Sequence, residues 1–224
     1  MDILIIDNKN YIIDDCIEIG QGGNWKVYSA KILPKLQFPL IETDDIVIKI
    51  PTNGCIKTNK KNRDLIKKAG IPCLEFMMIG QYKGGMVIVT ENLNYRNKSL
   101  LYVSSNYHPS NKNNCFLEHL SFSKRIPCKN EEILSNNKLD SIKNENEVIK
   151  ELRQLADKCT QNKIMISNDV FFFGVDIIKQ TIEDILIADY DCIYPNTENY
   201  LETKNLDSVN TMFQEFKMHY VKTD

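Results

Sequence analysis

The chain has 224 residues, of which 42% are hydrophobic, and this is enough apolar material for one well-formed core or two small ones. Its formal net charge of -2 argues against partners that demand a basic surface, so we expect neither nucleic-acid binding nor attachment to an anionic membrane. The longest apolar runs, such as residues 86–89, are far too short to span a bilayer.

The N-terminal residues and the cysteines predict a cytosolic setting. Asp2 and Asp7 stand where a secretory signal would carry basic residues, so no such signal is expected. The 7 cysteines are scattered and form no Cys-x-x-Cys pair. This spacing disfavours both a disulfide framework and a zinc site, and it favours reduced thiols.

The first 95 residues read mainly as short strands with one helix. A lysine-rich segment beginning at Thr52 predicts a short helix that Gly70 closes, and a glycine turn at 81–85 predicts a tight hairpin with positive φ. The pattern indicates a hairpin-rich antiparallel sheet with one inserted helix. The predicted strands cover residues 2–6, 11–19, 26–30, 46–50, 73–79 and 86–90.

The remaining residues are more helical. Residues 96–146 are rich in Asn, Ser and Lys and predict a loop-rich insertion with one short helix near 115–121. Residues 147–161 predict the best helix of the chain, and a second helix is expected near 206–220. A strand is expected at 185–188. The apolar stripes of the two helices are Val148, Leu152, Leu155 and Cys159, and Val209, Met212, Phe213 and Phe216.

A glycine turn and a lysine carry the strongest chemical signal. Gly20, Gly22 and Gly23 lie between two predicted strands and indicate a tight turn. A glycine-rich turn lets backbone amides approach phosphate oxygens without side-chain obstruction. Lys49 ends the apolar triplet of the following strand. Because a lysine in a buried strand is costly unless it is paired, we expect an anionic partner such as a phosphate or a carboxylate.

These residues resemble the protein kinase superfamily. Residues 20–30 look like its glycine-rich loop, with Gly20, Gly22, Gly23 and Val27 at matching positions, and 46–49 look like the strand that carries the ATP-binding lysine. Trp25 departs from the pattern because it replaces the third glycine, where it either caps a cleft or packs on the sheet.

The resemblance implies further nucleotide-binding residues. Residues 86–93 are similar to the strand that leads into the hinge, where the backbone of Glu91 and Leu93 would meet the adenine edge. An acidic partner of Lys49 is expected on the inserted helix. Asp64 is the acid within that segment, and Glu75 is the alternative.

In the second half, residues 185–191 resemble the strand and Asp-Phe-Gly motif of kinases. Asp189 would then hold Mg²⁺ against the phosphates of ATP, and the second Mg²⁺ ligand is either absent or supplied from elsewhere, for example by Asp176 or Asp191. Residues 163–170 occupy the place of the catalytic loop. There Asp169 is the candidate base, although an alignment on Asn168 would leave no base.

The catalytic loop departs from the family pattern in two ways. Gly174 stands five residues after Asp169, where kinases have a metal-binding Asn. The aromatic triplet 171–173 replaces a polar stretch, and such triplets are more typical of a core or an interface. The overall length is similar to that of miniature bacterial kinases, of the small YrbL type or of the kind that pathogens inject as effectors.

We therefore expect an α+β, protein kinase-like two-lobed fold. Residues 1–95 would form the antiparallel N-lobe sheet with one short helix, and 96–224 a reduced, mainly helical C-lobe containing the insertion at 96–146. The implied function is an atypical ATP- and Mg²⁺-dependent kinase of the Ser/Thr type, acting on a protein substrate from the cytoplasm or after delivery into a host cell without a classical signal peptide. The alternatives are a catalytically inactive pseudokinase that binds a regulatory protein partner, and a generic α+β domain without kinase ancestry.

Overall fold

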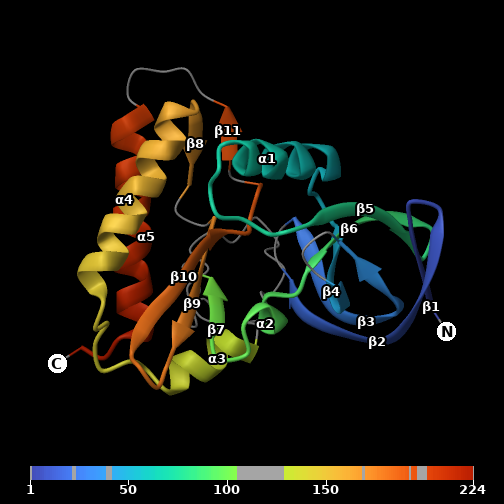
Figure 1. The fold of residues 1–224 in the computed structure, drawn as a ribbon, viewed down its shortest axis with the longest axis horizontal. Coiled ribbons are helices and arrows are strands. Elements are labelled where there is room, and N and C mark those ends of the chain that lie inside the picture. Colours follow the sequence, from blue (N-terminus) through green and yellow to red (C-terminus); the bar gives the residue numbers. More distant parts are fainter. Residues whose placement is uncertain are drawn as a thin grey trace, which may run out of the picture. The chain divides into compact units, whose positions relative to one another are not determined.

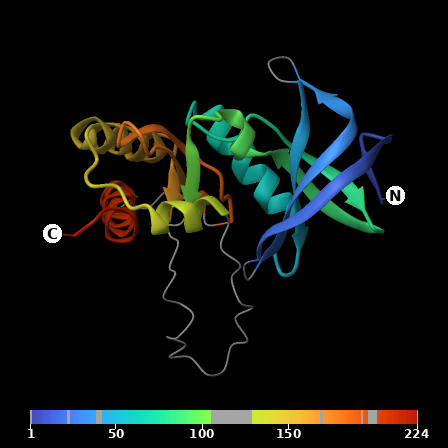
Figure 2. The same cartoon turned by 90° about the horizontal axis from the view of Figure 1, so that it is seen from below.

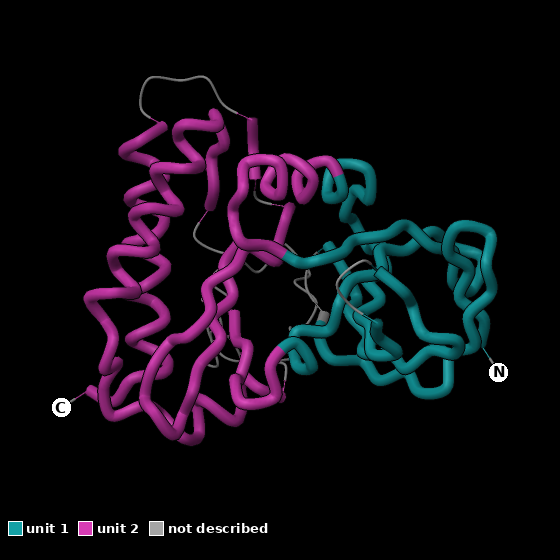
Figure 3. Tube along the Cα trace, in the orientation of Figure 1, with its two compact units in different colours: residues 1–60, 74–96, 110–128 teal, residues 61–73, 97–109, 129–224 magenta. Residues whose placement is uncertain are grey.

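The computed structural model describes residues 2–21, 24–38, 42–104, 129–167, 170–191, 193–195 and 201–223. The chain divides into two compact units, which Figure 3 shows in different colours. Unit 1 comprises residues 1–60, 74–96 and 110–128, and unit 2 comprises residues 61–73, 97–109 and 129–224. Helix α1 (Ile56–Lys68) contributes residues to both units.

Unit 1 is a closed antiparallel barrel with the strand order β1-β2-β3-β4-β6-β5 (Figure 1). Alternate residues of the strands point inward, as the period of two requires, and aliphatic side chains fill the interior. Leu4, Ile32, Ile46 and Ile48 are completely buried there. The strands are β1 (Asp2–Ile6), β2 (Lys9–Gln21), β3 (Trp25–Gln37), β4 (Glu42–Pro51), β5 (Met77–Tyr82) and β6 (Gly85–Glu91).

The barrel closes through the pairing of β1 with β5. Ile6 lies opposite Gly80, and Leu4 lies opposite Tyr82. A Cβ atom at Gly80 would lie 2.9 Å from the backbone oxygen of Ile5, which is closer than real Cβ contacts. The absence of a side chain at Gly80 therefore permits the approach of the two strands.

Polar side chains reinforce the same closure. The Tyr82 hydroxyl donates a hydrogen bond to Asp2 Oδ2 (2.8 Å), and Lys83 Nζ lies 2.9 Å from the same oxygen. The hydrogen bond from Lys83, followed by that from Tyr82, lowers the pKa of the Asp2 carboxyl. Burial, followed by the bond to Asp2, raises the pKa of Tyr82 to about 12, so the phenol remains a donor at neutral pH.

These pKa shifts predict a destabilisation at low pH that depends on Asp2. A carboxyl with a lowered pKa in the folded state stabilises the fold above its unfolded pKa, and this contribution is lost as pH falls through the folded pKa. We expect the melting temperature of the wild type to fall between about pH 4 and pH 2 more steeply than that of Asp2→Asn. Parallel slopes in thermal melts of the two proteins would contradict this role.

Local signals explain the hairpin and the helix of the first half. Lys83 (φ 50°) and Gly84 (φ 78°) both take the left-handed conformation that the two-residue turn between β5 and β6 requires. Helix α1 ends before Gly70 (φ 66°), as predicted from that glycine. A short helix, α2 (Leu93–Arg96), follows β6.

Unit 2 combines two small antiparallel sheets with helices. One sheet has the strand order β10-β9-β7 and the other the order β11-β8. Helices α4 and α5 pack side by side in both views (Figures 1 and 2). The elements are β7 (Leu101–Ser104), α3 (Lys129–Asn136), α4 (Glu145–Gln161), β8 (Ile164–Ile166), β9 (Phe171–Asp176), β10 (Thr181–Ile187), β11 (Ile193–Pro195) and α5 (Leu201–Tyr220).

The core of unit 2 lies between the two long helices and the β9–β10 hairpin. The Phe173 ring contacts Phe216 edge to face, with centroids 4.8 Å apart. The two predicted helices are confirmed, since all the residues of their predicted apolar stripes are buried. The second helix begins at Leu201, five residues earlier than predicted, and Asn205 on its added turn is also buried.

The predicted protein kinase-like two-lobed fold is wrong. The N-terminal strands form a closed six-stranded barrel rather than an open N-lobe sheet, because β1 pairs with β5 as well as with β2. The second half also differs from the expected C-lobe, since besides its helices it has strands that form two antiparallel sheets. Strand β7 and helix α3 lie within the predicted loop-rich insertion, and the helix predicted near 115–121 lies outside the described residues. No helix within the described ranges has the length and apolar character to cross a membrane.

Candidate functional site

Three of the predicted nucleotide-binding residues lie in one row across the barrel. Val27 of β3 pairs with Gly20 of β2 on one side and with Lys49 of β4 on the other. Lys49 in turn pairs with Ile88 of β6. We call Gly20, Val27, Lys49 and Ile88 the Lys49 row. The structure thus brings together the glycine-turn hairpin and the lysine that the sequence singled out.

The side chains of the Lys49 row belong to the outer face of the barrel. Ile48 and Ile50 pack with the interior cluster, and because the strand period is two, the intervening Lys49 points outward. Lys49 and Val27 are half-buried, and Ile88 is fully buried. The outward side of β4 therefore offers a cation next to aliphatic surface.

A second row lies beside the first on the same face. Ser29 pairs with Val47, and Val47 pairs with Thr90. Val47 and Thr90 are buried. These two residues were not predicted as part of the site, although their two-residue spacing from Lys49 and Ile88 is a signal that they share the face. A single lysine thus stands among Val27, Val47 and Ile88.

The tip of the glycine turn, including Gly22 and Gly23, lies outside the described residues. Trp25, which follows shortly after this turn, is buried. A Cβ at Gly54 would overlap the indole ring of Trp25, so the ring rests against that glycine. The backbone amides of Thr52 and Gly54 also donate to the Asn24 carbonyl oxygen.

The side chains of Glu91 and Leu93 do not lie on the barrel face that carries Lys49. Glu91 pairs with the inward-pointing Ile46, so its carboxylate lies on the opposite face from Lys49. Its Oε1 accepts a hydrogen bond from the backbone amide of Glu75 (2.6 Å) and lies 4.0 Å from Arg96 Nη1. Leu93 begins helix α2 instead of continuing a strand.

The Glu75 and Asp64 side chains, the two candidate acids for Lys49, both lie near arginines. Glu75 Oε1 is 3.8 Å from Arg96 Nη2, and Asp64 Oδ1 is 3.5 Å from Arg63 Nη1. Glu75 precedes β5 rather than forming part of it. The acidic partner of Lys49 remains a prediction.

In unit 2, Asp189 and Asp191 share one turn. We call residues 188–191 the Asp189 turn. The backbone amide of Asp191 donates to Asp189 Oδ1 (3.3 Å), and the amides of Ala188 and Asp189 donate to the Val170 carbonyl oxygen. Both carboxylates are half-buried. The turn is therefore fixed at its start by the residue that precedes β9.

The two carboxylates fit Mg²⁺ only in combination with phosphate ligands. No group of three or more metal-binding side chains occurs among the residues that the structure describes. Mg²⁺ in phosphoryl-transfer sites is typically held by one or two carboxylates together with substrate phosphates and water, and Asp189 and Asp191 match that donor set. Asp176, the other candidate ligand, lies at the opposite end of the β9–β10 hairpin and contacts Lys179 (3.3 Å).

The candidate base Asp169 and its neighbour Asn168 lie outside the described residues. The aromatic triplet is resolved: Phe171 and Phe173 are completely buried in β9. Phe171 and Phe173 therefore belong to the core of unit 2, one of the two environments expected for such a triplet, and Phe172 is half-buried.

Gly174 has a packing role in the same strand. A Cβ at this position would lie 3.0 Å from both Asp184 Cβ and Leu100 Cδ1, and 3.1 Å from Tyr102 Cε1. We expect Gly174→Asn to destabilise the protein by about 1–3 kcal/mol, the usual cost of overpacking. Thermal melts should show no such loss for the control Gly84→Asn, because Gly84 has no atom within 4 Å and Asn tolerates its positive φ. Equal melting temperatures for both variants would contradict this role.

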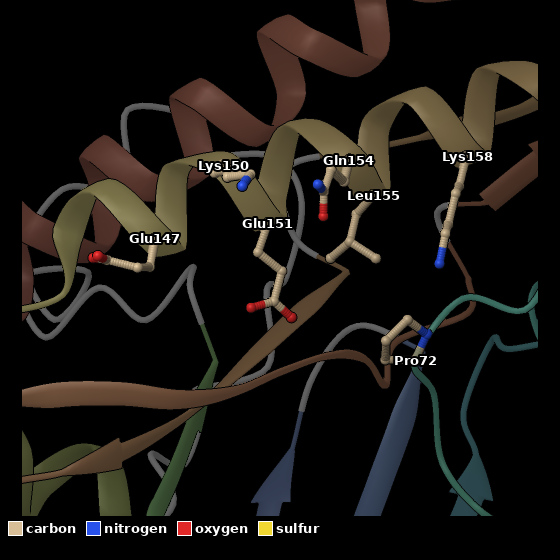
Figure 4. A pocket seen from close by; sticks show the side chains of 7 residues that line it. All are labelled: Pro72, Glu147, Lys150, Glu151, Gln154, Leu155 and Lys158. Carbon is tan, nitrogen blue, oxygen red and sulfur yellow. The ribbon is translucent and has the colours of Figure 1, made fainter.

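A pocket in unit 2 contains none of the predicted site residues. Its volume is about 410 Å³, and it lies between α4 and Pro72 (Figure 4). We call it the α4 pocket. Burial, followed by the charge of Asp184, raises the pKa of the Glu151 carboxyl. The carboxylates of Glu147 and Glu151 offset the positive charges of the two lysines that line the α4 pocket, so the pocket is poorly suited to a phosphate. It is lined by Pro72, Glu147, Lys150, Glu151, Gln154, Leu155 and Lys158.

Comparison with family models finds no match for the chain, and comparison with curated proteins finds none either.

Proposed function

We propose that the chain binds ATP with Mg²⁺ and transfers the γ-phosphoryl group to a protein hydroxyl. The observation that carries the proposal is the Lys49 row, in which the glycine-turn hairpin, Val27 and Lys49 are direct neighbours across three strands. The proposal does not depend on a kinase fold, because the same chemistry can occur on unrelated folds.

The residues around Lys49 match the two parts of a nucleotide. The half-buried aliphatic side chain of Val27 offers contact area for a planar base, whereas the Lys49 ammonium offers a charge for the α- and β-phosphates. The glycine turn would add backbone amides for the remaining phosphate oxygens. Nucleotide sites commonly combine a mostly apolar lining with a few charged or polar groups in this way.

The chemistry of the transfer requires few further groups. The oxygen of the protein hydroxyl attacks the γ-phosphorus, the bond to the β–γ bridging oxygen breaks, and ADP leaves. In this proposal the carboxylate of Asp169 accepts the hydroxyl proton. Asp189 and Asp191 are the residues that would hold Mg²⁺, whose charge favours phosphoryl transfer when it is bound. Such transfer relies mainly on positioning and charge neutralisation.

Incorporation of labelled γ-phosphate tests the proposal. The wild type should label a mixture of generic protein substrates, or itself, in the presence of Mg²⁺, and Asp189→Asn should not. A thermal melt of each protein with Mg²⁺ and ATP accompanies the assay, because a ligand that binds the folded state raises the melting temperature. The absence of both incorporation and stabilisation in the folded wild type would refute the proposal.

One observation favours a second candidate, a nucleotide-binding regulatory module that does not transfer phosphate. The packing around Gly174 leaves little space for the Asn that active kinases have at the corresponding distance from the base. Stabilisation by Mg²⁺ and ATP without incorporation of label would support this second candidate. Incorporation that is lost in Asp189→Asn would support the first.

A further inference from the structure

A buried asparagine on helix α1 contacts the segment that carries Asp189 and Asp191. Asn62 is 3% exposed. Its Nδ2 donates one hydrogen bond to the Tyr190 carbonyl oxygen (2.8 Å) and a second to the Ile193 carbonyl oxygen (2.9 Å). Both N–H groups of the Asn62 amide thus donate to backbone carbonyls that lie 128 and 131 residues further along the chain.

The two acceptors enclose the end of the Asp189 turn. Tyr190 stands between Asp189 and Asp191, and Ile193 begins β11. The Tyr190 ring is completely buried, and its hydroxyl donates to the Ile187 carbonyl oxygen (2.9 Å). By bridging the two carbonyls, the Asn62 amide holds the chain on both sides of Asp191.

Other hydrogen bonds also hold this segment, including those from the Ala188 and Asp189 amides to the Val170 carbonyl oxygen. The Ile187 amide donates to the Pro72 carbonyl oxygen (3.0 Å), and Ile193 pairs with Ile166 of β8. Removal of the Asn62 amide would leave two carbonyl groups without these donors, and buried carbonyls without partners are costly. The conformation of the Asp189 turn is therefore expected to be sensitive to this one side chain.

We infer that Asn62 is a positioning residue that holds Asp189 and Asp191 in the conformation in which both carboxylates can meet one Mg²⁺. The inference rests on the proposed function, which assigns Mg²⁺ to those carboxylates. Groups that orient metal ligands commonly change metal affinity by about 10–100-fold when they are removed. Asn62 acts through the backbone of the turn and is not itself a ligand in this inference.

Mn²⁺ binding tests the inference without an activity assay. Mn²⁺ replaces Mg²⁺ as the probe, and its free concentration is measured by electron paramagnetic resonance in the presence of a non-hydrolysable ATP analogue. We expect Asn62→Ala to weaken Mn²⁺ affinity at least about tenfold. Asn62→Ser, which retains one short donor, should have an intermediate affinity. Hydrogen exchange should be faster at residues 188–193 in both variants.

Asn144→Ala is the matched control. The Asn144 amide also makes two bonds to backbone, donating to the Ile182 carbonyl oxygen (2.8 Å) and accepting from the Ile182 amide (3.1 Å), at the end of β10 away from the Asp189 turn. This variant loses a comparable pair of bonds, but its Mn²⁺ affinity should match that of the wild type. Exposed Lys61 on α1 provides a second control, Lys61→Ala.

The outcomes separate the inference from the function on which it rests. If the wild type binds Mn²⁺ with the nucleotide and folded Asn62→Ala binds it equally well, the positioning role is wrong and the proposed function stands. Equal weakening in Asn62→Ala and Asn144→Ala would also overturn the role, because the effect would then be general destabilisation. If the wild type itself binds no Mn²⁺ with the nucleotide, the proposed function fails and the inference fails with it.

Discussion

Replacement of Lys49 by methionine should weaken the binding of Mg²⁺ and a non-hydrolysable ATP analogue by about 10–100-fold. This range corresponds to the loss of one hydrogen bond between charged groups, about 1.5–3 kcal/mol. Methionine retains most of the length and apolar character of the lysine stem, so contacts with Val27 and Ile88 are conserved. The dissociation constants are measured by isothermal titration calorimetry.

Lys31→Met is the matched control for the lysine. Lys31 lies on β3 with the same strand parity as Val27, and its side chain is exposed. Loss of this charge changes the net charge by the same amount but removes no member of the Lys49 row. Equal affinities of Lys49→Met and Lys31→Met would show that the phosphates bind elsewhere.

Replacement of Gly80 by valine should be the most destabilising change in the barrel. The added Cβ would meet the backbone oxygen of Ile5 at 2.9 Å, and this oxygen cannot move without disturbing the β1–β5 pairing. We expect a loss of about 3 kcal/mol, the upper end of the usual cost of overpacking. The free energy of unfolding is measured by denaturant titration, with hydrogen exchange of residues 2–6 as a local measure of barrel closure.

Gly85→Val controls for the general effect of replacing glycine in a strand. Gly85 lies in β6, and its added Cβ would find the Tyr82 carbonyl oxygen at 3.7 Å, which is an ordinary contact distance. Valine at this position should cost little. If Gly80→Val and Gly85→Val unfold at the same denaturant concentration, the close approach of β1 to β5 does not limit stability.

The sequence predicted local structure better than it predicted pairing between distant strands. The apolar stripe of α4 and the glycine at the end of α1 both follow from short-range chemistry, and both are confirmed. The pairing of β1 with β5 joins residues almost 80 positions apart, and strand patterns alone do not specify it. Gly80 within an apolar strand was the available signal, since an isolated glycine there often marks a close approach of backbone.

The second half shows a different reason for error. The short strand β7 (Leu101–Ser104) lies in a stretch rich in Asn and Ser. Because this composition is typical of loops, the four-residue β-rich run was not predicted as a strand. Most of β9 is buried, as in a strand covered on both faces, and such a run lacks the alternation that identifies half-exposed strands. The β10-β9-β7 sheet therefore could not be predicted from periodicity.

The candidate site was predicted in part. Gly20, Val27 and Lys49 were identified from their chemistry, and their strand register places them in adjacent positions. Asn62 was missed because an asparagine in a lysine-rich helix looks like a solvated residue. Its role depends on carbonyl groups more than 120 residues away, which no local pattern indicates.

Methyl chemical shifts provide the most direct test of the central claim, that the nucleotide binds at the Lys49 row. The protein is labelled at Ile, Leu and Val methyl groups and titrated with Mg²⁺ and a non-hydrolysable ATP analogue. Binding at the Lys49 row should shift the methyl signals of Val27, Val47 and Ile88, whereas those of the exposed Ile3 and Leu33 of the same barrel should not change. Saturable shifts confined to the α4 pocket, or no saturable shift at any methyl group, would contradict the account.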